Sequence, residues 1–539
     1  MGTYSEKQKQ MLQWVVYQIY PRSFLDTNGD GIGDLPGVIA RLDYLKELGV
    51  NAVWLCPCYK SPNDDNGYDV SDYRDIMDEF GTLDDAKKLI AELHARGMKL
   101  IMDLVPNHTS SAHKWFRESR KSASKDNPYR DYYYWADEPL NDWKACFGGS
   151  VWVFDPVRGQ YYLHSYAVSQ PDLNWNNPSV VREMQDIVDY WVDLGVDGFR
   201  IDVIDQISKD FEHGRNCFGP QLHDYIRALF GRDKVKHLFT VGECWANDID
   251  EIERHCGADR GELTTLFQFD HLECGRSDKF TPKADSLRSL RDILVRWETQ
   301  MSGRNLIYTL FTDNHDQNRY ISRMGNDTCL RYESATCIAT MLYGLQGIPF
   351  VYQGQEFGCT GSEYGRIEDF RDIECLNMYE ELIKTMSPEE AVRKINFGSR
   401  DNARRPMQWN DGRNGGFSEG EPWIPPASRY REINLKKDLQ SPKSVFRYYR
   451  DLFALRRTYS AFTAGETAFV SRPEDPFFAY IRSADGVRML VVCNFEQTTE
   501  IRLSFTGKVL LSNSGRKKPD GLYQPYETAV FRLSERSSG

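Results

Sequence analysis

The strongest constraint on the fold is an alternation of two kinds of segment that repeats eight times along the chain. Short apolar or β-branched runs begin at Trp14, Asn51, Lys99, Val196, Leu238, Thr265, Ile307 and Ile348. Helix-like segments such as 35–49, 83–97 and 178–195 lie between them, and each ends in glycine, the common residue after a helix C-cap. Apolar strands that alternate with helices indicate a parallel sheet covered on both faces. Eight units predict an α/β fold of the (β/α)8 TIM barrel type, with a doubly wound open sheet as the alternative.

Two departures from this alternation predict additional domains. Between about residues 107 and 172 the third strand is not followed by its helix, and the segment is rich in Trp, Tyr, Asp, Asn and Gly. After about residue 464 only strand-like runs remain, separated by turn residues. We therefore predict a barrel formed by 1–107 and 173–464, an inserted domain B at 108–172 over the barrel mouth, and a C-terminal antiparallel β-sandwich at 465–539.

Composition narrows the partners and the location. The net charge of -12 over 539 residues disfavours nucleic acid or an anionic membrane as the main partner. No apolar stretch approaches the roughly 18–20 residues of a membrane span, and the N-terminal segment lacks a signal-peptide pattern. The 12 cysteines form no paired C-x-x-C frame, so we expect reduced thiols and no bound zinc. We expect a cytoplasmic monomer or weak homodimer with no membrane partner.

Acidic residues cluster where the predicted strands end. These strand-end acids are Asp103, Asp202, Glu243, Asp313 and Asp316, and Arg200, His108 and His315 lie near them in the sequence. A single acid there could be a helix cap, but the C-terminal ends of barrel strands meet at one mouth and carry the chemistry. Paired carboxylates in a cleft are typical of glycoside hydrolysis. Arg200 and Asp202 share one strand, and we expect Arg200 to keep Asp202 ionised.

Four segments, "DLVPNH", "GFRID", "GECW" and "TDNHDQ", resemble in order the signature segments of the α-amylase family of glycoside hydrolases. The resemblance covers essentially the whole chain. It implies that Asp202 is the nucleophile, Glu243 the general acid/base and Asp316 the acid that holds the sugar at the transition state. His108, His315 and Arg200 would hold the sugar hydroxyls and the nucleophile. The implied mechanism is retaining, with the Asp202 and Glu243 carboxyl groups about 5–5.5 Å apart.

Two further segments, "NGYDVSDY" and "SRDNARRPMQW", resemble the exo-acting α-glucosidase and oligo-1,6-glucosidase branch of that family. By this resemblance Asp69 and Arg404 pair and clamp a terminal glucose, and Tyr68 stacks on its ring. A salt bridge between surface loops is the alternative for Asp69 and Arg404. Arg405 departs from the threonine usual in this branch, and we expect it to add charge near the pocket rim.

Three residues bear on the linkage that is cleaved. Val203, directly after the nucleophile, resembles the α-1,6-acting members of the branch. Trp245 would form a platform for the second glucose, and Lys279 would contact that sugar. We therefore predict a small oligosaccharide substrate, with terminal α-1,6-linked glucose removed from isomaltose and short isomalto-oligosaccharides.

Several alternatives remain open at this point. Within the family they are α-1,4-glucosidase or sucrase action, trehalose-6-phosphate hydrolysis and sucrose isomerisation. The segment 318–335 lacks the arginine- and aspartate-rich loop that isomerases share, which disfavours the last. A non-catalytic relative acting as a binding subunit is the remote alternative, and the presence of all three acids argues against it.

The loop "DTNGDGIGD" resembles a hard-cation site. Asp26, Asn28, Asp30 and Asp34, with the carbonyl of Ile32, alternate like ligands of an EF-hand loop, but the twelfth position is Gly37 rather than Glu. By the family resemblance the loop holds a structural Ca2+ or Mg2+ ion far from catalysis. The alternative is an Asp/Asn/Gly turn without an ion. No organic cofactor is expected.

Overall fold

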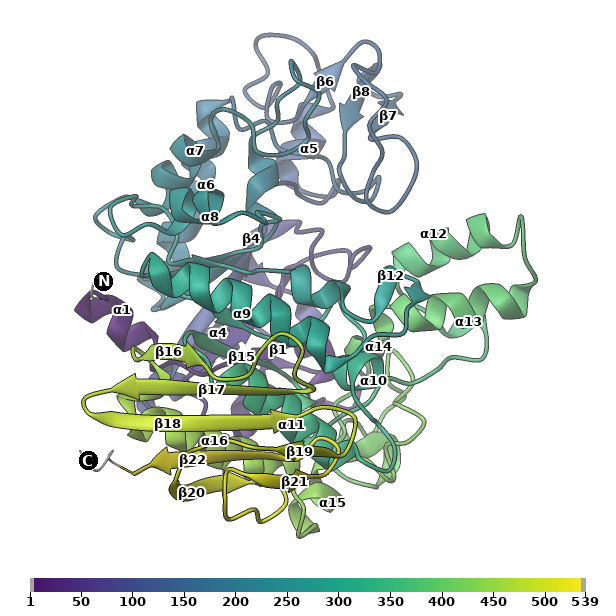
Figure 1. The fold of residues 1–539 in the computed structure, drawn as a ribbon. Coiled ribbons are helices and arrows are strands. Elements are labelled where there is room, and N and C mark those ends of the chain that lie inside the picture. Colours follow the sequence, from purple (N-terminus) through teal and green to yellow (C-terminus); the bar gives the residue numbers. More distant parts are fainter. Residues whose placement is uncertain (1–3, 535–539) are drawn as a thin grey trace.

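The computed structural model describes residues 4–534, and its centre is a parallel barrel (Figure 1). The strands pair in the order β11-β10-β9-β5-β2-β1-β15-β14. Their bounds are β1 (Val16–Ile19), β2 (Ala52–Leu55), β5 (Lys99–Leu104), β9 (Gly198–Ile201), β10 (Phe239–Gly242), β11 (Thr265–Leu266), β14 (Thr309–Leu310) and β15 (Ile348–Tyr352). Each coincides with one of the eight apolar runs, so the barrel is confirmed and the open sheet is wrong.

The seam between β11 and β14 closes through side chains. The Thr265 hydroxyl donates to the carbonyl oxygen of Ile307 at 2.6 Å, and the Thr309 hydroxyl donates to that of Leu266 at 3.1 Å. Two short strands thus meet through hydroxyl groups where no backbone ladder joins them, and the barrel is nearly closed.

One or more helices follow each strand. They are α2 (Leu35–Ala40) and α3 (Leu42–Leu48) after β1, α4 (Leu83–Ala95) after β2, α6 (Pro178–Asp193) after β5, α7 (Leu222–Phe230) after β9, α8 (Ile249–Cys256) after β10, α9 (Leu287–Gly303) after β11, α10 (Tyr320–Met324) and α11 (Arg331–Tyr343) after β14, and α16 (Val445–Thr458) after β15. The sequence specifies their ends: Thr82 caps α4 through a capping box, and α3 ends at Gly49, whose φ of 99° suits glycine. α1 (Glu6–Met11) precedes the barrel.

The insertion after β5 contains a small antiparallel sheet rather than only irregular chain. α5 (Lys114–Ser119) precedes β6 (Trp135–Ala136), β7 (Trp152–Asp155) and β8 (Gln160–Leu163), which pair in the order β6-β8-β7. A backbone bridge between His108 and Asp172 brings the two ends of the insertion together. Figure 1 shows this part projecting from one end of the barrel. The limits given above for the domains stay predictions.

The C-terminal part has two unequal layers. A five-stranded antiparallel sheet runs β16 (Glu466–Phe469), β17 (Phe477–Ala484), β18 (Val487–Asn494), β22 (Thr528–Leu533), β20 (Gly507–Ser512). The second layer is the ribbon of β19 (Thr499–Ile501) and β21 (Gly521–Tyr523). Phe478 and Tyr480 join the core of the barrel, whereas Ala479 and Leu490 pack with Ile501 of the ribbon in a separate core. The predicted sandwich is therefore present.

The long segment between β15 and α16 was not predicted in detail. It contains α12 (Ile373–Leu382), α13 (Pro388–Gly398), α14 (Asp401–Arg404) and α15 (Leu435–Gln440), and α12 and α13 form a projecting helical hairpin (Figure 1). Two small strand pairs were also missed: β3 (Tyr59–Lys60) with β4 (Asp72–Ile76), and β12 (Arg276–Asp278) with β13 (Thr281–Pro282). Within residues 4–534, no helix has the length and apolar character needed to cross a membrane.

Candidate active site

A pocket of about 310 Å³ lies at the C-terminal ends of the barrel strands. Asp202 follows β9, Glu243 follows β10, and Asp316 lies in the loop after β14; all three line the pocket. Asp202 and Glu243 lie side by side at the ends of two paired strands, because the Glu243 N–H donates to the carbonyl oxygen of Ile201 at 2.8 Å. The predicted catalytic acids thus come from three different strands to one cavity.

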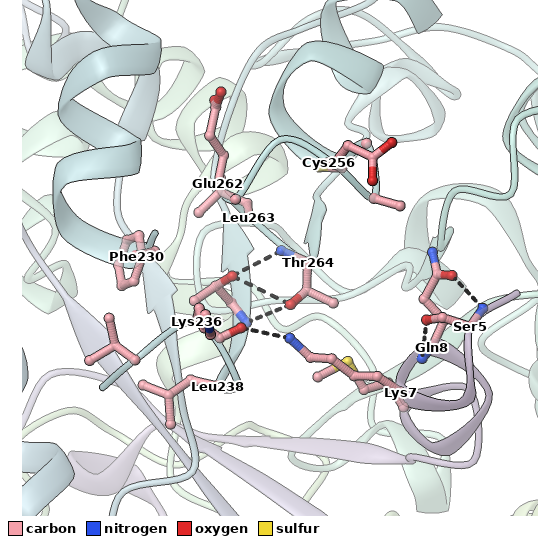
Figure 2. A pocket seen from close by; sticks show the side chains of 17 residues that line it. Ser5, Lys7, Gln8, Phe230, Lys236, Leu238, Cys256, Glu262, Leu263 and Thr264 are labelled. Atoms are coloured by element: carbon pink, nitrogen blue, oxygen red, sulfur yellow. Dashed lines mark hydrogen bonds between the residues drawn. The ribbon is translucent and has the colours of Figure 1, made fainter. Parts of the chain in front are cut away.

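A second pocket, of about 380 Å³, opens at the opposite end of the barrel, beside α1 and the starts of β10 and β11. There the Lys7 ammonium donates to the carbonyl oxygen of Lys236 at 2.9 Å (Figure 2). The acids of this pocket, Asp259 and Glu262, come from the loop before β11. Because no strand-end carboxylates meet there, the acid/base chemistry belongs to the first pocket.

Arg200 forms ion pairs with three carboxylates at the first pocket. Its Nη1 lies 2.8 Å from Asp202 Oδ1 and 2.9 Å from Asp103 Oδ1, and its Nη2 bonds Glu243 Oε2. The guanidinium is buried, and its charge is shared among three acids. An arginine at the end of an apolar strand is therefore neutralised by the groups that it positions.

Burial opposes the predicted effect of Arg200 on the nucleophile. Burial raises the pKa of Asp202 well above its usual range; Arg200 lowers it, while Glu243 and Asp103 raise it further. Arg200 therefore acts in the predicted direction, but the net effect of the surroundings is to raise the pKa of Asp202. A retaining mechanism uses one protonated carboxyl group and one carboxylate, and Asp202 and Glu243, both bonded to Arg200, are placed to supply them.

Asp316 has the opposite environment. Burial acts to raise its pKa, but His315, Arg404, Arg400 and Lys279 together hold that pKa well below its usual range. Arg404 Nη2 lies 2.8 Å from Asp316 Oδ1, and His315 Nε2 lies 3.2 Å from Oδ2. Asp316 is thus a fixed carboxylate, suited to accept hydrogen bonds from sugar hydroxyls.

The predicted pairing of Asp69 with Arg404 is wrong. Among the ion pairs of residues 4–534, none joins these two side chains. The Asp69 carboxylate is buried and accepts the N–H groups of Asp64 and Asp65, each at 3.0 Å, so it shapes its own loop. The surface salt bridge considered as the alternative is equally absent.

The pair that the structure places in the pocket is Asp65 and Arg400. Both line it, and Arg400 Nη2 lies 3.2 Å from Asp65 Oδ1. Arg400 also pairs with Asp372 at 2.5 Å and reaches Asp316 at 3.5 Å. Each partner lies four residues before the residue first chosen; Arg400 is within the second quoted segment, and Asp65 directly precedes the first. The sequence pointed to the right region, but spacing could not show which side chain faces inward.

Arg405 also lies elsewhere than expected. Its guanidinium is buried, stacks 3.7 Å above the centre of the Tyr364 ring and donates to the carbonyl oxygen of Pro426 at 3.1 Å. It is not among the residues that line the pocket. The extra charge therefore stabilises the loop behind the site instead of altering the pocket rim.

Of the predicted sugar-holding residues Tyr68, His108 and His315, the first two line the pocket and the third lies behind Tyr68. The Tyr68 hydroxyl donates to Asp103 Oδ2 at 3.1 Å. His315 is stacked under Tyr68, with ring centres 5.2 Å apart. Burial lowers the pKa of His108 to about 4 and that of His315 to about 3. Both imidazoles are therefore neutral at pH 7.

The three residues predicted to bear on the linkage, Val203, Trp245 and Lys279, all belong to the pocket lining. Trp245 is 53% exposed and lies against Phe269 at 4.7 Å between ring centres, so one flat face is available. The Lys279 ammonium pairs with Glu374 of α12, a pocket residue that the sequence did not reveal. Further lining residues that were missed are Cys146, Phe147, Tyr166, Gln206, Phe269, Asn314 and Gln317.

Val203 has an unusual backbone. Its φ of 34° and ψ of 50° lie in the left-handed region, which a β-branched residue rarely adopts. Such strain is concentrated at functional sites because the surrounding structure enforces it. Here the turn directs the chain away from β9 straight after Asp202.

The loop of residues 26–34 is organised by its own backbone. Asp26 accepts the N–H groups of Gly29 and Gly31, and Asp34 caps α2 by accepting the Gly37 N–H. The carboxylates of Asp26, Asp30 and Asp34 do not form a three-ligand cluster within 4.8 Å. As arranged, the loop does not match a cation site built from carboxylates alone.

Comparisons with known proteins agree with this geometry. A model of the α-amylase catalytic domain matches residues 18–465. An oligo-1,6-glucosidase of Parageobacillus thermoglucosidasius is 45% identical over 96% of this chain and 98% of its own. A trehalose-6-phosphate hydrolase of Bacillus subtilis is 40% identical over 97% and 98%. The solved trehalose-6-phosphate hydrolase of Bacillus licheniformis has a TM-score of 0.91 at 39% identity, covering 97% of this chain and 100% of that one.

Proposed function

The chain belongs to the α-amylase family of glycoside hydrolases, and from this we propose that it is a retaining, exo-acting α-glucosidase for terminal α-1,6-linked glucose. Isomaltose and short isomalto-oligosaccharides are the proposed substrates. The observation that carries the proposal is the pocket in which Asp202 and Glu243 share Arg200, opposite Asp316. Relatives named oligo-1,6-glucosidase support the linkage.

The proposed chemistry follows from the two carboxyl groups that Arg200 holds together. Glu243 donates its proton to the glycosidic oxygen while Asp202 attacks the anomeric carbon, so the glycosidic bond breaks and a glucosyl ester forms. Glu243 then removes a proton from water, which attacks the same carbon and releases Asp202. Arg200 orients both groups. A separation of about 5–5.5 Å between them stays a prediction.

An exo-acting mode is supported by the polar end of the pocket. Asp65, Arg400 and Asp316 form one charged cluster there, with His108 beside it. Such a cluster suits the hydroxyl groups of a terminal sugar, because charge-assisted hydrogen bonds are strong and directional. Trp245 and the pair of Lys279 and Glu374 lie where a second sugar would leave the pocket.

The substrate assignment is tested by measuring glucose release from isomaltose, maltose, sucrose and trehalose-6-phosphate side by side. We expect kcat/KM for isomaltose to exceed the others by about tenfold or more, the scale set by small steric differences in a pocket. A preference for maltose or sucrose would retain the catalytic acids but show that Val203 does not set the linkage. A preference for trehalose-6-phosphate would replace the proposed substrate altogether.

Asp205 gives a prediction for pH. Burial raises its pKa to about 7, because one oxygen only accepts the Trp245 N–H and the other has no hydrogen-bond partner. The folded state therefore holds this proton between about pH 4 and 7, where the unfolded state loses it, and stability falls as pH rises through that window. We expect Asp205→Asn, which cannot ionise, to raise Tm relative to wild type at pH 8 more than at pH 5. An equal Tm difference at both pH values contradicts this explanation.

For the loop of residues 26–34 we propose a structural Ca2+ or Mg2+ ion that uses Asp26, Asp30 and Asp34 with the oxygens of Asn28 and Ile32. The exposed Asn28 and Asp30 support this, but the carboxylates must move together to bind. We expect CaCl2 to raise Tm by a few degrees after EDTA treatment in wild type, and Asp30→Ala to remove that rise. An identical Tm with EDTA and with CaCl2 would favour the ion-free turn.

A cytoplasmic location is proposed as well. All twelve cysteines are free thiols, which is typical of a reducing compartment. We further propose a monomer or weak homodimer.

A further inference from the structure

We propose that His223, Glu251 and His255 bind a zinc-like divalent transition-metal ion. His223 lies at the start of α7, and Glu251 and His255 lie four residues apart on one face of α8. One possible ligand atom from each residue lies within 4.8 Å of the other two. In residues 4–534 no other group of His, Cys, Asp and Glu meets this condition.

The distances fit a small tetrahedral ion. Glu251 Oε1 lies 3.6 Å from His223 Nε2 and 3.5 Å from His255 Nδ1. An ion with bonds of about 2.0–2.2 Å holds its ligand atoms roughly 3.3–3.5 Å apart, which matches the two distances to Glu251. The two imidazole nitrogens lie within 4.8 Å of each other and complete the group. Two imidazole nitrogens and one carboxylate oxygen, with water as the fourth ligand, favour zinc over calcium or magnesium.

A hydrogen bond to Glu262 orients the His223 ring so that its Nε2 atom can bind a metal ion. Its Nδ1 donates to Glu262 Oε2 at 2.7 Å, and the Glu262 side chain is fully buried. Metal-binding histidines commonly donate their other ring N–H to a carboxylate, which fixes the tautomer. In the neutral ring the Nε2 lone pair then faces Glu251 Oε1. A proton or a metal ion bound between these two atoms offsets their repulsion.

His255 contributes the second imidazole of the cluster. Its side chain is fully buried; Nδ1 donates to the carbonyl oxygen of Glu251 at 2.9 Å, and Nε2 has no hydrogen-bond partner among the described residues. Binding of a metal at Nδ1 transfers the ring proton to Nε2 and leaves the imidazole neutral. Binding therefore exchanges the hydrogen bond from Nδ1 to the Glu251 carbonyl oxygen for a metal bond at the same nitrogen.

Neighbouring arginines leave the metal-facing oxygen free. Arg254 binds Glu251 Oε2 at 2.9 Å, and Arg227 binds Glu262 Oε1 at 2.8 Å. Their positive charge opposes a further cation, so we expect weaker binding than in a closed structural zinc site. An ion here would join α7 to α8, the helices that follow the strands leading to Asp202 and Glu243. Its role is therefore stabilisation of two neighbouring units of the barrel.

The test is to titrate the chelator-treated, full-length protein with ZnCl2. Binding is monitored by competition with a chromophoric chelator and by the change in Tm. We expect one zinc per chain and a rise in Tm. Glu251→Gln and His223→Gln should each weaken binding by at least about tenfold, the scale expected when a metal's ligand shell is disturbed. CoCl2 should give a visible absorption spectrum that both variants lose.

His94→Gln is the matched control, because His94 also pairs with an acid, Asp197, at 2.8 Å but lies on α4. It should bind zinc like wild type. Equal zinc affinity in all four proteins, or no binding at tenfold molar excess of ZnCl2, overturns the proposal. If Glu251→Gln does not fold, His223→Gln decides, since that side chain is partly exposed.

Discussion

Asp202→Asn is expected to lower kcat/KM for isomaltose by roughly 10⁴-fold or more, the scale seen when the nucleophile of a covalent hydrolase is removed. The amide cannot form the glucosyl ester, and it leaves Arg200 with one fewer anion. Glucose release under initial-rate conditions measures the effect. Burst kinetics with an activated glucoside should show that the covalent intermediate no longer accumulates.

Asp205→Asn is the matched control for this variant. It makes the same chemical change three residues along the same segment, at a side chain that is equally buried but does not line the pocket. We expect it to keep most of its activity at pH 6. Substantial hydrolysis by Asp202→Asn, or equal losses in the two variants, would show that Asp202 is not the nucleophile.

The sequence was most informative where a periodic pattern determines structure. Short apolar runs such as that from Lys99 to Leu104, repeated eight times between helical patterns, are typical of buried parallel strands, so the barrel and the strand-end acids were predictable. The hairpin of α12 and α13 was not, because it lies in the long segment between β15 and α16, where no further strand maintains the alternation. Glu374 of the pocket was missed for the same reason.

Side-chain direction within loops was the other limit. Asp65 and Asp69 belong to one loop, and only the fold shows that Asp69 accepts two backbone N–H groups while Asp65 meets Arg400. The left-handed backbone of Val203 was equally hidden, because valine rarely adopts it. Such positions depend on tertiary contacts that override local preference.

Asp65→Asn is expected to lower kcat/KM for isomaltose by about 10- to 100-fold, the equivalent of roughly 1.5–3 kcal/mol for a hydrogen bond to a charged group. The physical reason is that Asp65 faces the sugar beside Arg400, and a neutral amide accepts a hydroxyl proton less strongly. Asp69→Asn should instead lower Tm, since its single amide oxygen cannot accept the N–H groups of both Asp64 and Asp65.

Asp65→Asn and Asp69→Asn together show which of the two acids contacts the sugar, because each possibility predicts a different combination of changes in kcat/KM and Tm. If Asp65→Asn changes kcat/KM with little change in Tm, and Asp69→Asn does the reverse, the sugar is held by Asp65 and Arg400. If Asp69→Asn loses activity at unchanged Tm while Asp65→Asn stays active, Asp69 contacts substrate and its loop must rearrange on binding. Arg400→Lys adds a third measurement: it keeps the charge but loses the fork that reaches Asp65 and Asp372 together, so it should reduce kcat/KM at least as much as Asp65→Asn.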